Sequence, residues 1–172
     1  MSARTFVDTN IFVYWLDASE PKKRNIADDW LRRLWREQEG RTSLQVVNEL
    51  YVTLTRKLKH RLSCEDAWET AQTLFAWDPY PTNRELLARA KEIEARFGIS
   101  WWDSLIVAAA QLQECRLLLS EDLQHGMHFG QVVIQNPFEA SVQDTASLYV
   151  IETLPPRHRG RGRPVRPKVG AT

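Results

Sequence analysis

Four acidic residues of this 172-residue chain stand at positions where a folded domain could bring them together. Asp8 and Asp122 each follow a short apolar run that is typical of a buried strand. Asp103 opens an apolar segment, and Glu49 lies on a segment with helical periodicity. Carboxylates gathered within a few ångströms raise one another's pKa, and a divalent cation relieves their repulsion. Hard oxygen ligands favour Mg²⁺ or Mn²⁺ over zinc, and such a site can activate water against a phosphodiester.

Each acid also has an ordinary structural explanation. Asp8 can cap the helix that follows it, and Asp103 can complete a helix cap that begins at Ser100. In open α/β sheets, however, sites form outside the carboxyl ends of the strands, which is where Asp8 is expected. A carboxylate at Asp103 would open a helix that is apolar all round. These two positions therefore fit either a structural or a chemical role.

The other two acids leave similar alternatives open. Glu49 falls about 60° beyond the apolar arc of residues 46–58, so it is either a solvated flank residue or part of a cleft. Asp122 can simply form a turn after the strand. Glu121 is a plausible companion, and the sequence does not decide which of the two side chains points inward. The four acids indicate a metal site only as a set.

The elements that must position these acids follow from periodicity and capping. Strands are predicted at Thr5–Val7, Arg116–Leu119 and Val132–Ile134, with a brief extended link over residues 41–44. Helices are predicted over residues 9–16, 22–39, 46–58, 63 to about 77, 82–97 and 100 to about 110. Thr82 and Glu85 are expected to form a capping box, and Gly98 to end that helix. Alternating helices and short apolar strands predict an α/β fold with a parallel sheet covered on both faces.

Composition separates the body of the chain from its end. The last 18 residues hold six of the 23 Lys and Arg and none of the 22 Asp and Glu, so residues 1–154 carry a net charge of −5. This tail, residues 155–172, is rich in Pro, Gly and Arg and is expected to be disordered. It is either a passive extension or an arm that holds RNA near an acidic body. If it is an RNA arm, truncation after Leu154 should flatten the salt dependence of RNA binding.

Several other classes of protein and site are disfavoured. No apolar run is long enough to span a bilayer, and no basic head with an apolar signal core opens the chain, so a cytoplasmic protein is expected. Cys64 and Cys115 are too few for a disulfide scaffold. His125 and His128 are interpreted as loop residues rather than zinc ligands. The chain has no phosphate-cradling Gly-rich motif and no nucleophile elbow.

The segments around the four acids resemble the acidic motifs of the PIN domain, and the chain is most similar to the toxins of VapBC toxin–antitoxin pairs. The segments that carry this resemblance are Phe6-Val7-Asp8-Thr9-Asn10, Asn48-Glu49-Leu50, Trp102-Asp103-Ser104-Leu105-Ile106 and Leu119-Ser120-Glu121-Asp122. Asn136-Pro137-Phe138 resembles the usual ending of that domain. The resemblance covers roughly residues 4–138, and the order and spacing of the motifs make it specific as a set.

The resemblance implies a fold and a chemistry. It implies a PIN-like three-layer α/β/α domain at residues 1–140, with a short central parallel sheet, followed by an extension at 141–154 and the tail. It implies an Mg²⁺-dependent endoribonuclease, with Mn²⁺ as a possible substitute. The metal ligands would be Asp8, Asp103 and Asp122, and Glu49 would complete the catalytic set. The residues that would support them are Asn10, Ser120 and Glu121.

The resemblance also implies partners. The substrate would be RNA, an antitoxin protein would inhibit the enzyme, and the chain would form a homodimer. The alternative is a PIN-like RNA-binding or assembly module that does not cleave. Four intact acids favour the enzyme, because a phosphate-binding site has no use for clustered negative charge. The sequence does not identify the RNA or its cleavage site.

Overall fold

The computed structural model describes residues 3–139, and strands and helices alternate along this part of the chain. The strands are β1 (Thr5–Val7), β2 (Gly40–Arg41), β3 (Leu117–Leu119), β4 (His128–Phe129) and β5 (Val132–Gln135). The helices are α1 (Thr9–Leu16), α2 (Pro21–Glu37), α3 (Leu44–Val52), the π-helix η1 (Thr53–Lys57), α4 (Cys64–Gln72), the 3₁₀-helix η2 (Thr73–Trp77), α5 (Arg84–Phe97) and α6 (Trp101–Leu112).

The described strands form one five-stranded sheet in the order β2-β1-β3-β5-β4. The pairs β1–β2, β1–β3 and β3–β5 are parallel, which confirms the predicted sheet. Only β4 departs from it, because it pairs antiparallel with β5 through the register His128↔Val133. The two strands are joined by a tight turn at Gly130, whose φ of 63° suits glycine. The sequence analysis did not predict this edge strand.

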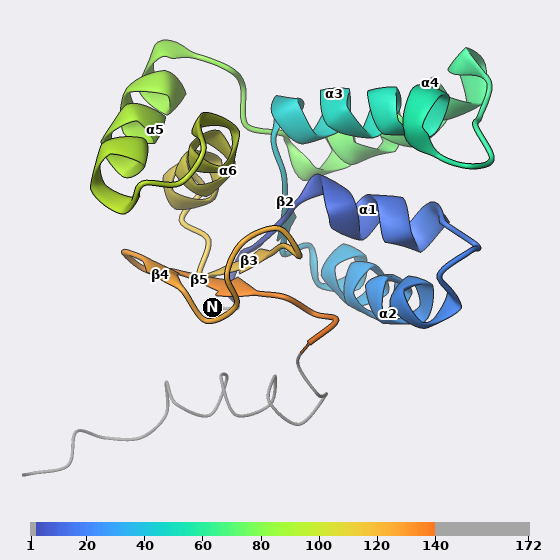
Figure 1. Cartoon of the computed structure of the whole chain (residues 1–172), viewed down its shortest axis with the longest axis horizontal. Coiled ribbons are helices and arrows are strands. Elements are labelled where there is room, and N and C mark those ends of the chain that lie inside the picture. Colours follow the sequence, from blue (N-terminus) through green and yellow to red (C-terminus); the bar gives the residue numbers. More distant parts are fainter. Residues whose placement is uncertain (1–2, 140–172) are drawn as a thin grey trace, which may run out of the picture. The chain divides into compact units, whose positions relative to one another are not determined.

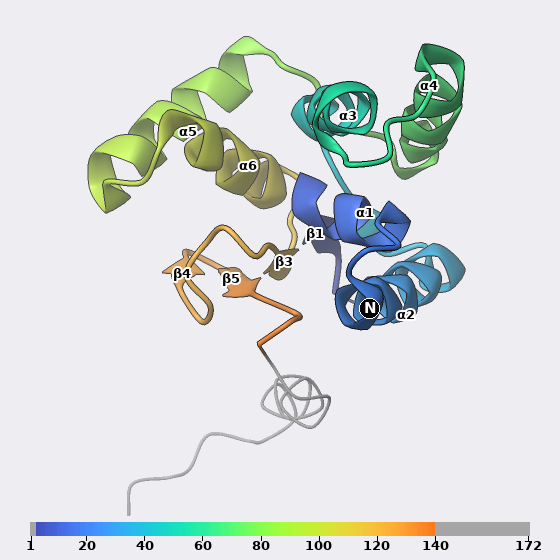
Figure 2. The ribbon, with the colours of Figure 1, turned by 45° about the vertical axis from the view of Figure 1, so that its right-hand side comes forward.

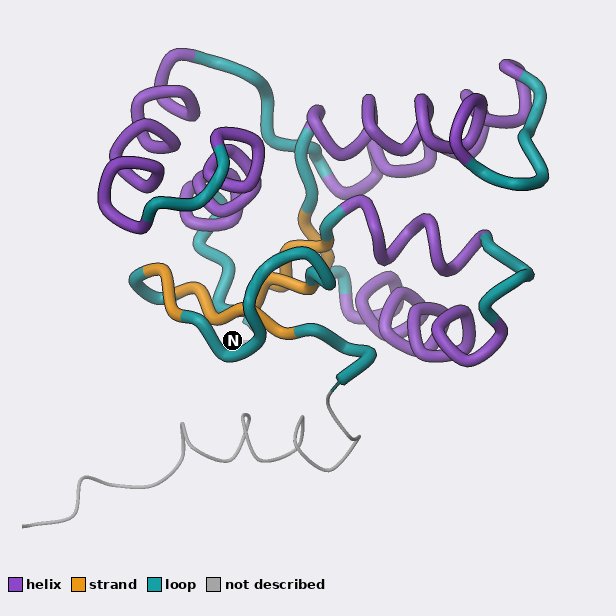
Figure 3. The backbone as a smooth tube through the Cα atoms, viewed as in Figure 1, coloured by secondary structure: helices purple, strands orange, loops and turns teal. Residues whose placement is uncertain are grey.

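Helices flank the sheet on both sides, as predicted. Figures 1 and 2 show α1 packed with α2 on one side of the strands and α5 packed with α6 on the other. In Figure 3 the short strands gather in one place between the longer helices. Helix α6 is buried from Ser104 to Ala110, so its all-round apolar sequence does place it at the centre of the domain. The largest fully buried side chains include Phe6, Phe12 and Phe129.

Most helix boundaries follow from local capping, and one predicted cap is wrong. Ser100 caps α6 by accepting from Asp103 N, and Gly98 ends α5 with a left-handed φ of 66°. Helix α5 is capped by Asn83, whose side chain accepts from Leu86 N at 2.9 Å, and not by Thr82. Asn is a strong N-cap residue, and its extended backbone places the side chain oxygen over the first turn.

Two further boundaries differ from prediction. The helix predicted over residues 46–58 is regular only to Val52 and continues as the π-helix η1 to Lys57. Its end is marked by Leu58 N, which donates to Thr53 O. The link predicted at residues 41–44 contributes part of a strand, because Gly40 and Arg41 pair with Thr5 and Phe6 of β1. Two residues are too few for a strand to be recognised from periodicity.

The predicted extension at 141–154 and tail at 155–172 lie outside the described residues. Within residues 3–139, no helix is long and apolar enough to cross a membrane.

Candidate active site

The first part of the site forms where two parallel strands end side by side. Val7 of β1 pairs with Leu119 of β3, so Asp8 and Ser120 follow their strands at the same edge of the sheet. The backbone joins them there, because Asp8 N donates to Leu119 O at 3.0 Å. Ser120 Oγ donates to Asp8 Oδ2 at 2.7 Å, and Asp8 Oδ1 accepts from Thr9 N. Asp8 therefore caps α1, as predicted, and also accepts a hydrogen bond from the end of the neighbouring strand.

Asn10 connects the first acid to the last. Its Nδ2 donates to Asp122 Oδ2 at 3.0 Å and lies 3.4 Å from Asp8 Oδ2. Its Oδ1 accepts from Glu121 N at 3.3 Å. Ser120 supports the same loop, since its Oγ accepts from Asp122 N at 3.2 Å. One neutral amide thus spans two carboxylates that are separated by 114 positions in the chain.

Glu49 reaches the site from α3 through the first residue of α1. Thr9 Oγ1 donates to Glu49 Oε2 at 2.7 Å, and Gln45 Nε2 donates to Glu49 Oε1 at 2.9 Å. Glu49 is half-buried. Of its two predicted environments, the structure places it at the edge of the buried face beside Asp8 rather than on a fully solvated flank.

Asp103 is held differently from the other three acids. Its Oδ2 accepts from Ser100 Oγ at 2.7 Å, and its backbone N–H donates to the same Ser100 oxygen, which is a reciprocal cap at the start of α6. The link to the rest of the site runs through Gln45, whose Nε2 also lies 3.3 Å from Trp102 O. Gln45 thereby joins the residue before Asp103 to Glu49.

Burial dominates the electrostatics of Asp8, which is only 7% exposed. This burial raises the pKa of Asp8 to about 7, although hydrogen bonds from Ser120 and Thr9 oppose the rise. The negative charges of Glu49 and Asp122 raise the pKa of Asp8 further. Asp8 is therefore close enough to both carboxylates to be repelled by them, which is the condition under which a cation would be stabilising.

The neighbouring acid Glu121 has its own counter-ion. Lys23 Nζ of α2 donates to Glu121 Oε1, and the two side chains form an ion pair. The same ammonium donates to Tyr14 OH at 2.9 Å. Glu121 thus lies toward α1 and α2, whereas Asp122 shares Asn10 with Asp8. The contacts bring Asp122, not Glu121, into the acidic cluster.

The donor set suits a hard divalent cation, because carboxylate oxygens are the ligands that Mg²⁺ and Mn²⁺ prefer. The repulsion felt at buried Asp8 fits such an ion as well. As they stand, however, no three His, Cys, Asp or Glu side chains within residues 3–139 are arranged to hold a metal ion. Asp8, Asp122 and Glu49 cluster through their hydrogen-bond partners, and Asp103 stands at the neighbouring helix start.

Three residues of this network were not singled out from the sequence. Thr9 and Gln45 were missed because each owes its role to a partner on another helix, which no local pattern reveals. Lys23 was missed for the same reason, because its acid lies 98 positions away. The position of Gln45 one turn before Glu49 was the only available signal, since residues four apart share a helix face.

The weaker candidates have structural roles. His125 Nδ1 accepts from Asn136 N at 3.1 Å and so supports the turn after β5. His128 is an exposed strand residue. Cys64 is exposed and Cys115 is buried, and both are free thiols.

One of three comparisons with known proteins identifies a family for this chain. The family model of the PIN domain matches residues 5–126, which is most of the chain. Among solved structures, the crystal structure of the Mycobacterium tuberculosis toxin VapC20, described as cleaving the sarcin–ricin loop, aligns with a TM-score of 0.47. The alignment has 19% identity over 66% of this chain and 86% of that chain. A search of curated proteins gives no significant match. The extent of the family match shows that this chain belongs to the PIN domain family.

Proposed function

We propose that this protein is a divalent-metal-dependent endoribonuclease and the toxin of a type II toxin–antitoxin pair. Membership of the PIN domain family supports a nucleic-acid hydrolase. The observation that carries the proposal is the buried carboxylate of Asp8, held by Ser120 while Glu49 and Asp122 raise its pKa. A pure phosphate-binding module gains nothing from a buried carboxylate that neighbouring carboxylates repel, whereas a metal-dependent hydrolase needs one.

Asp8, Asp103 and Asp122 would hold Mg²⁺, with Mn²⁺ as a substitute. A divalent ion bound there supplies positive charge that offsets the negative charge of a phosphodiester in its transition state. Ser120 and Thr9 N fix the orientation of the Asp8 carboxylate, and Asn10 fixes that of Asp122. No covalent enzyme intermediate is required, because a water molecule is the nucleophile.

Glu49 would orient that attacking water. Its two oxygens are fixed by Thr9 Oγ1 and Gln45 Nε2, and each carboxylate oxygen retains a lone pair for a further hydrogen bond. The carboxylate is half-buried at the mouth of the acidic cluster, so water can reach it. The role of Glu49 is therefore the placement of a proton acceptor beside the scissile phosphate.

Trp102 adds a feature suited to single-stranded RNA. Its indole is 64% exposed, although the residue directly precedes Asp103 and its carbonyl is joined to Gln45. Unpaired bases stack on exposed aromatic faces, and sequence-specific recognition of RNA mostly targets single-stranded loops. Trp102 is thus the residue we expect to hold a base next to the scissile phosphate.

The partners follow from the same proposal. The acidic cluster would accept an arginine of an antitoxin in place of the metal ion, through charge-assisted hydrogen bonds. The chain would form a homodimer in the cytoplasm and bind the antitoxin there. Expression of the chain alone should slow growth, and coexpression of a small neighbouring gene should relieve it. Harmless high-level expression of a protein with verified nuclease activity would count against the toxin role.

The direct test is incubation of the purified protein with total RNA, with and without Mg²⁺, followed by mapping of the cleaved ends. We expect discrete new ends that require the metal and that vanish with EDTA. The matched control is Asp122→Asn prepared in parallel, which excludes a contaminating nuclease. RNA binding without cleavage, unchanged by Mg²⁺, would favour the non-catalytic module instead.

A further inference from the structure

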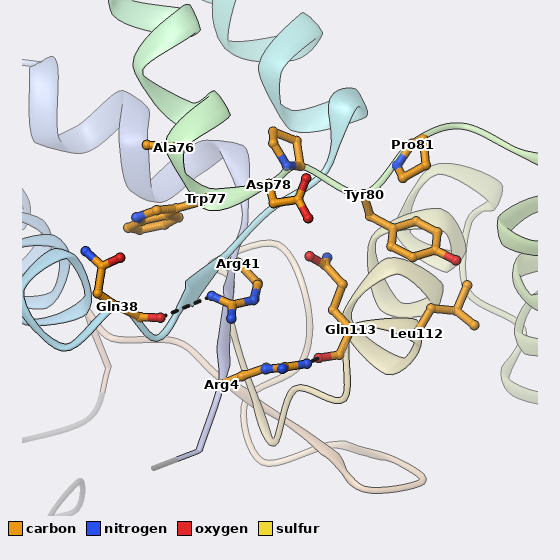
Figure 4. Close-up of a pocket in the computed structure, with 11 residues that line it drawn as sticks. Arg4, Gln38, Arg41, Ala76, Trp77, Asp78, Tyr80, Pro81, Leu112 and Gln113 are labelled. Atoms are coloured by element: carbon orange, nitrogen blue, oxygen red, sulfur yellow. Dashed lines mark hydrogen bonds between the residues drawn. The ribbon is translucent and has the colours of Figure 1, made fainter. Parts of the chain in front are cut away.

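A polar cavity lies away from the cluster of Asp8, Glu49 and Asp122. It has a volume of about 620 Å³ and opens beside Arg4, which precedes β1, whereas Asp8 follows that strand at its other end. Figure 4 shows side chains from three further segments around this space: Arg41 from β2, Asp78 and Tyr80 from the loop after η2, and Gln113 from the end of α6. The volume is within the range of pockets that hold small molecules.

Arg41 enters this pocket with most of its donors unused. Its Nη1 donates to Gly40 O at 2.7 Å and to Gln38 O at 3.2 Å, and both acceptors are main-chain carbonyls. Within residues 3–139, no carboxylate lies within ion-pair distance of Arg41. The guanidinium is therefore fixed in orientation while its charge is not neutralised, which is the state of an arginine that is ready to bind an anion.

Arg4, directly before β1, is fixed in the same way. Its Nη1 donates to Gln113 O at 3.1 Å. Its only ion pair in the described part of the chain is a 3.5 Å contact with Glu114, whose side chain is 78% exposed. Such an exposed contact contributes little. Arg4 thus contributes a second guanidinium that is oriented by a carbonyl and weakly neutralised.

The two positive charges converge on one buried region. Burial raises the pKa of the Cys115 thiol to about 12, and the charges of Arg41 and Arg4 both oppose that rise. Both arginines are therefore close to this single side chain. Because the thiol remains neutral, it does not balance them.

The opposite wall of the pocket is preformed. Trp77 packs so closely on Gly40 that a Cβ there would lie 2.4 Å from the indole. Tyr80 is fastened to the segment after β2, because Tyr80 N donates to Thr42 O and Leu44 N donates to Tyr80 O. Between them, Asp78 has a left-handed φ of 49°, an unfavourable conformation for a residue with a side chain. A rigid wall has little conformational entropy to lose when a ligand binds.

We propose that this pocket binds a small phosphorylated molecule, with its phosphate monoester on Arg41 and Arg4. Each guanidinium can donate two parallel N–H bonds, so two of them can be satisfied by the several oxygens of a phosphate but not by the two oxygens of one carboxylate. The cavity is larger than a phosphate alone, so the remaining space accommodates the group that carries it. Asp78 would accept a hydrogen bond from a hydroxyl of that group.

The test is calorimetric titration of the full chain with adenosine 5′-monophosphate and with inorganic phosphate. Adenosine is the control, because it is the same nucleoside without the phosphate. We expect both phosphate compounds to bind and adenosine not to bind. Arg41→Ala and Arg4→Ala should each weaken binding about tenfold or more, because each removes a charge-assisted pair. Arg56→Ala, which removes an exposed arginine of η1 outside the pocket, should leave binding unchanged.

Two variants make the result decisive. Arg41→Lys keeps the charge without the planar fork, so it should bind phosphate more weakly than the native chain even if Arg41→Ala fails to fold. Asp78→Asn removes the opposing negative charge and should not weaken the binding of inorganic phosphate. The proposal is wrong if neither phosphate compound binds at millimolar concentration, or if the Arg41 and Arg4 variants bind as Arg56→Ala does. RNA cleavage plays no part in this test, so its outcome is independent of the nuclease proposal.

Discussion

Asp8 and Asp103 are the same residue type and are both proposed metal ligands, yet the protein holds them in different ways. Asp8 is buried and accepts from Ser120, which lies 112 positions away in the chain. Asp103 is half-buried and accepts from Ser100, three positions away, in a cap that its own helix provides. One acid depends on tertiary structure, and the other depends on local structure.

Because of this difference, the two acids contribute differently to the stability of the fold. Ionisation of Asp8 requires a charge to be buried among like charges, so the folded protein resists it. Asp103 instead lies in the first turn of α6, where it accepts from Ser100 Oγ and helps to cap the helix. The buried acid therefore opposes the stability of the metal-free fold at neutral pH, whereas the capping acid supports it.

The largest expected effect is on catalysis. Asp8→Asn should lower the rate of metal-dependent RNA cleavage by about 10³-fold or more, because it removes a charge that the transition state requires. Asp103→Asn should lower the rate comparably, despite its different surroundings. The measurement is single-turnover cleavage at saturating Mg²⁺. If Asp8→Asn cleaves at the native rate, the assignment of the site is wrong.

The next comparison is between adjacent acids. Asp122→Asn should reduce cleavage by about 10²-fold or more, since it removes a proposed ligand. Glu121→Gln should change cleavage by less than about threefold, because Glu121 is paired with Lys23 outside the cluster. The same cleavage assay decides between them. A stronger loss in Glu121→Gln than in Asp122→Asn would reverse our choice of the fourth acid.

Asp8→Asn and Asp103→Asn should change the stability of the fold in opposite directions, although both should lower the cleavage rate. The pKa of Asp8 is raised in the folded state, so its contribution to stability is full below about pH 4 and is lost as the pH rises toward 7. In EDTA above pH 7, Asp8→Asn should therefore be more stable than the native chain, by roughly 2–4 kcal/mol. Asp103→Asn should instead be slightly destabilised.

Urea unfolding of the three proteins between pH 4 and pH 8 tests this expectation. The difference between the native chain and Asp8→Asn should grow with pH and level off above pH 7. A constant difference across this range would mean that Asp8 ionises normally in the folded state.

The smallest effect concerns substrate binding. Trp102→Ala should weaken the binding of a single-stranded RNA by about tenfold, which is within the range for the loss of one stacked base. Trp68→Ala is the control, because Trp68 is 48% exposed on α4 and lies in an edge contact with Phe75. Fluorescence anisotropy with a labelled oligonucleotide, in Ca²⁺ to prevent turnover, measures both. Equal affinities of the two variants would remove Trp102 from the substrate site.

The sequence predicted the features that local rules govern. The strand before Asp8, the Ser100 cap and the Gly98 stop are each set by a few neighbouring residues, and all are present. The short antiparallel strand β4 was not predicted, because two residues carry no periodicity. The capping box predicted at Thr82 and Glu85 is wrong, because the next residue, Asn83, caps the helix instead.

The sequence offered candidate acids, but it did not show how they are connected. Asn10 was expected to support Asp8, yet its stronger hydrogen bond is to Asp122. Sequence left Glu121 and Asp122 as alternatives, because both follow the same strand. The structure distinguishes them through Lys23 of α2, which pairs with Glu121, and nothing near Glu121 in the sequence indicates that partner. Contacts between distant segments depend on packing, which local patterns do not encode.

Two helices begin at the acidic cluster, α1 directly after Asp8 and α6 two residues before Asp103. The amino end of a helix carries a partial positive charge from its aligned peptide dipoles. These dipoles favour the carboxylates and any bound phosphate, but they disfavour a cation. The metal-free site should therefore bind Mg²⁺ weakly on its own and more tightly once a phosphodiester adds its negative charge. Metal and RNA would then bind cooperatively, each raising the affinity for the other by the same factor.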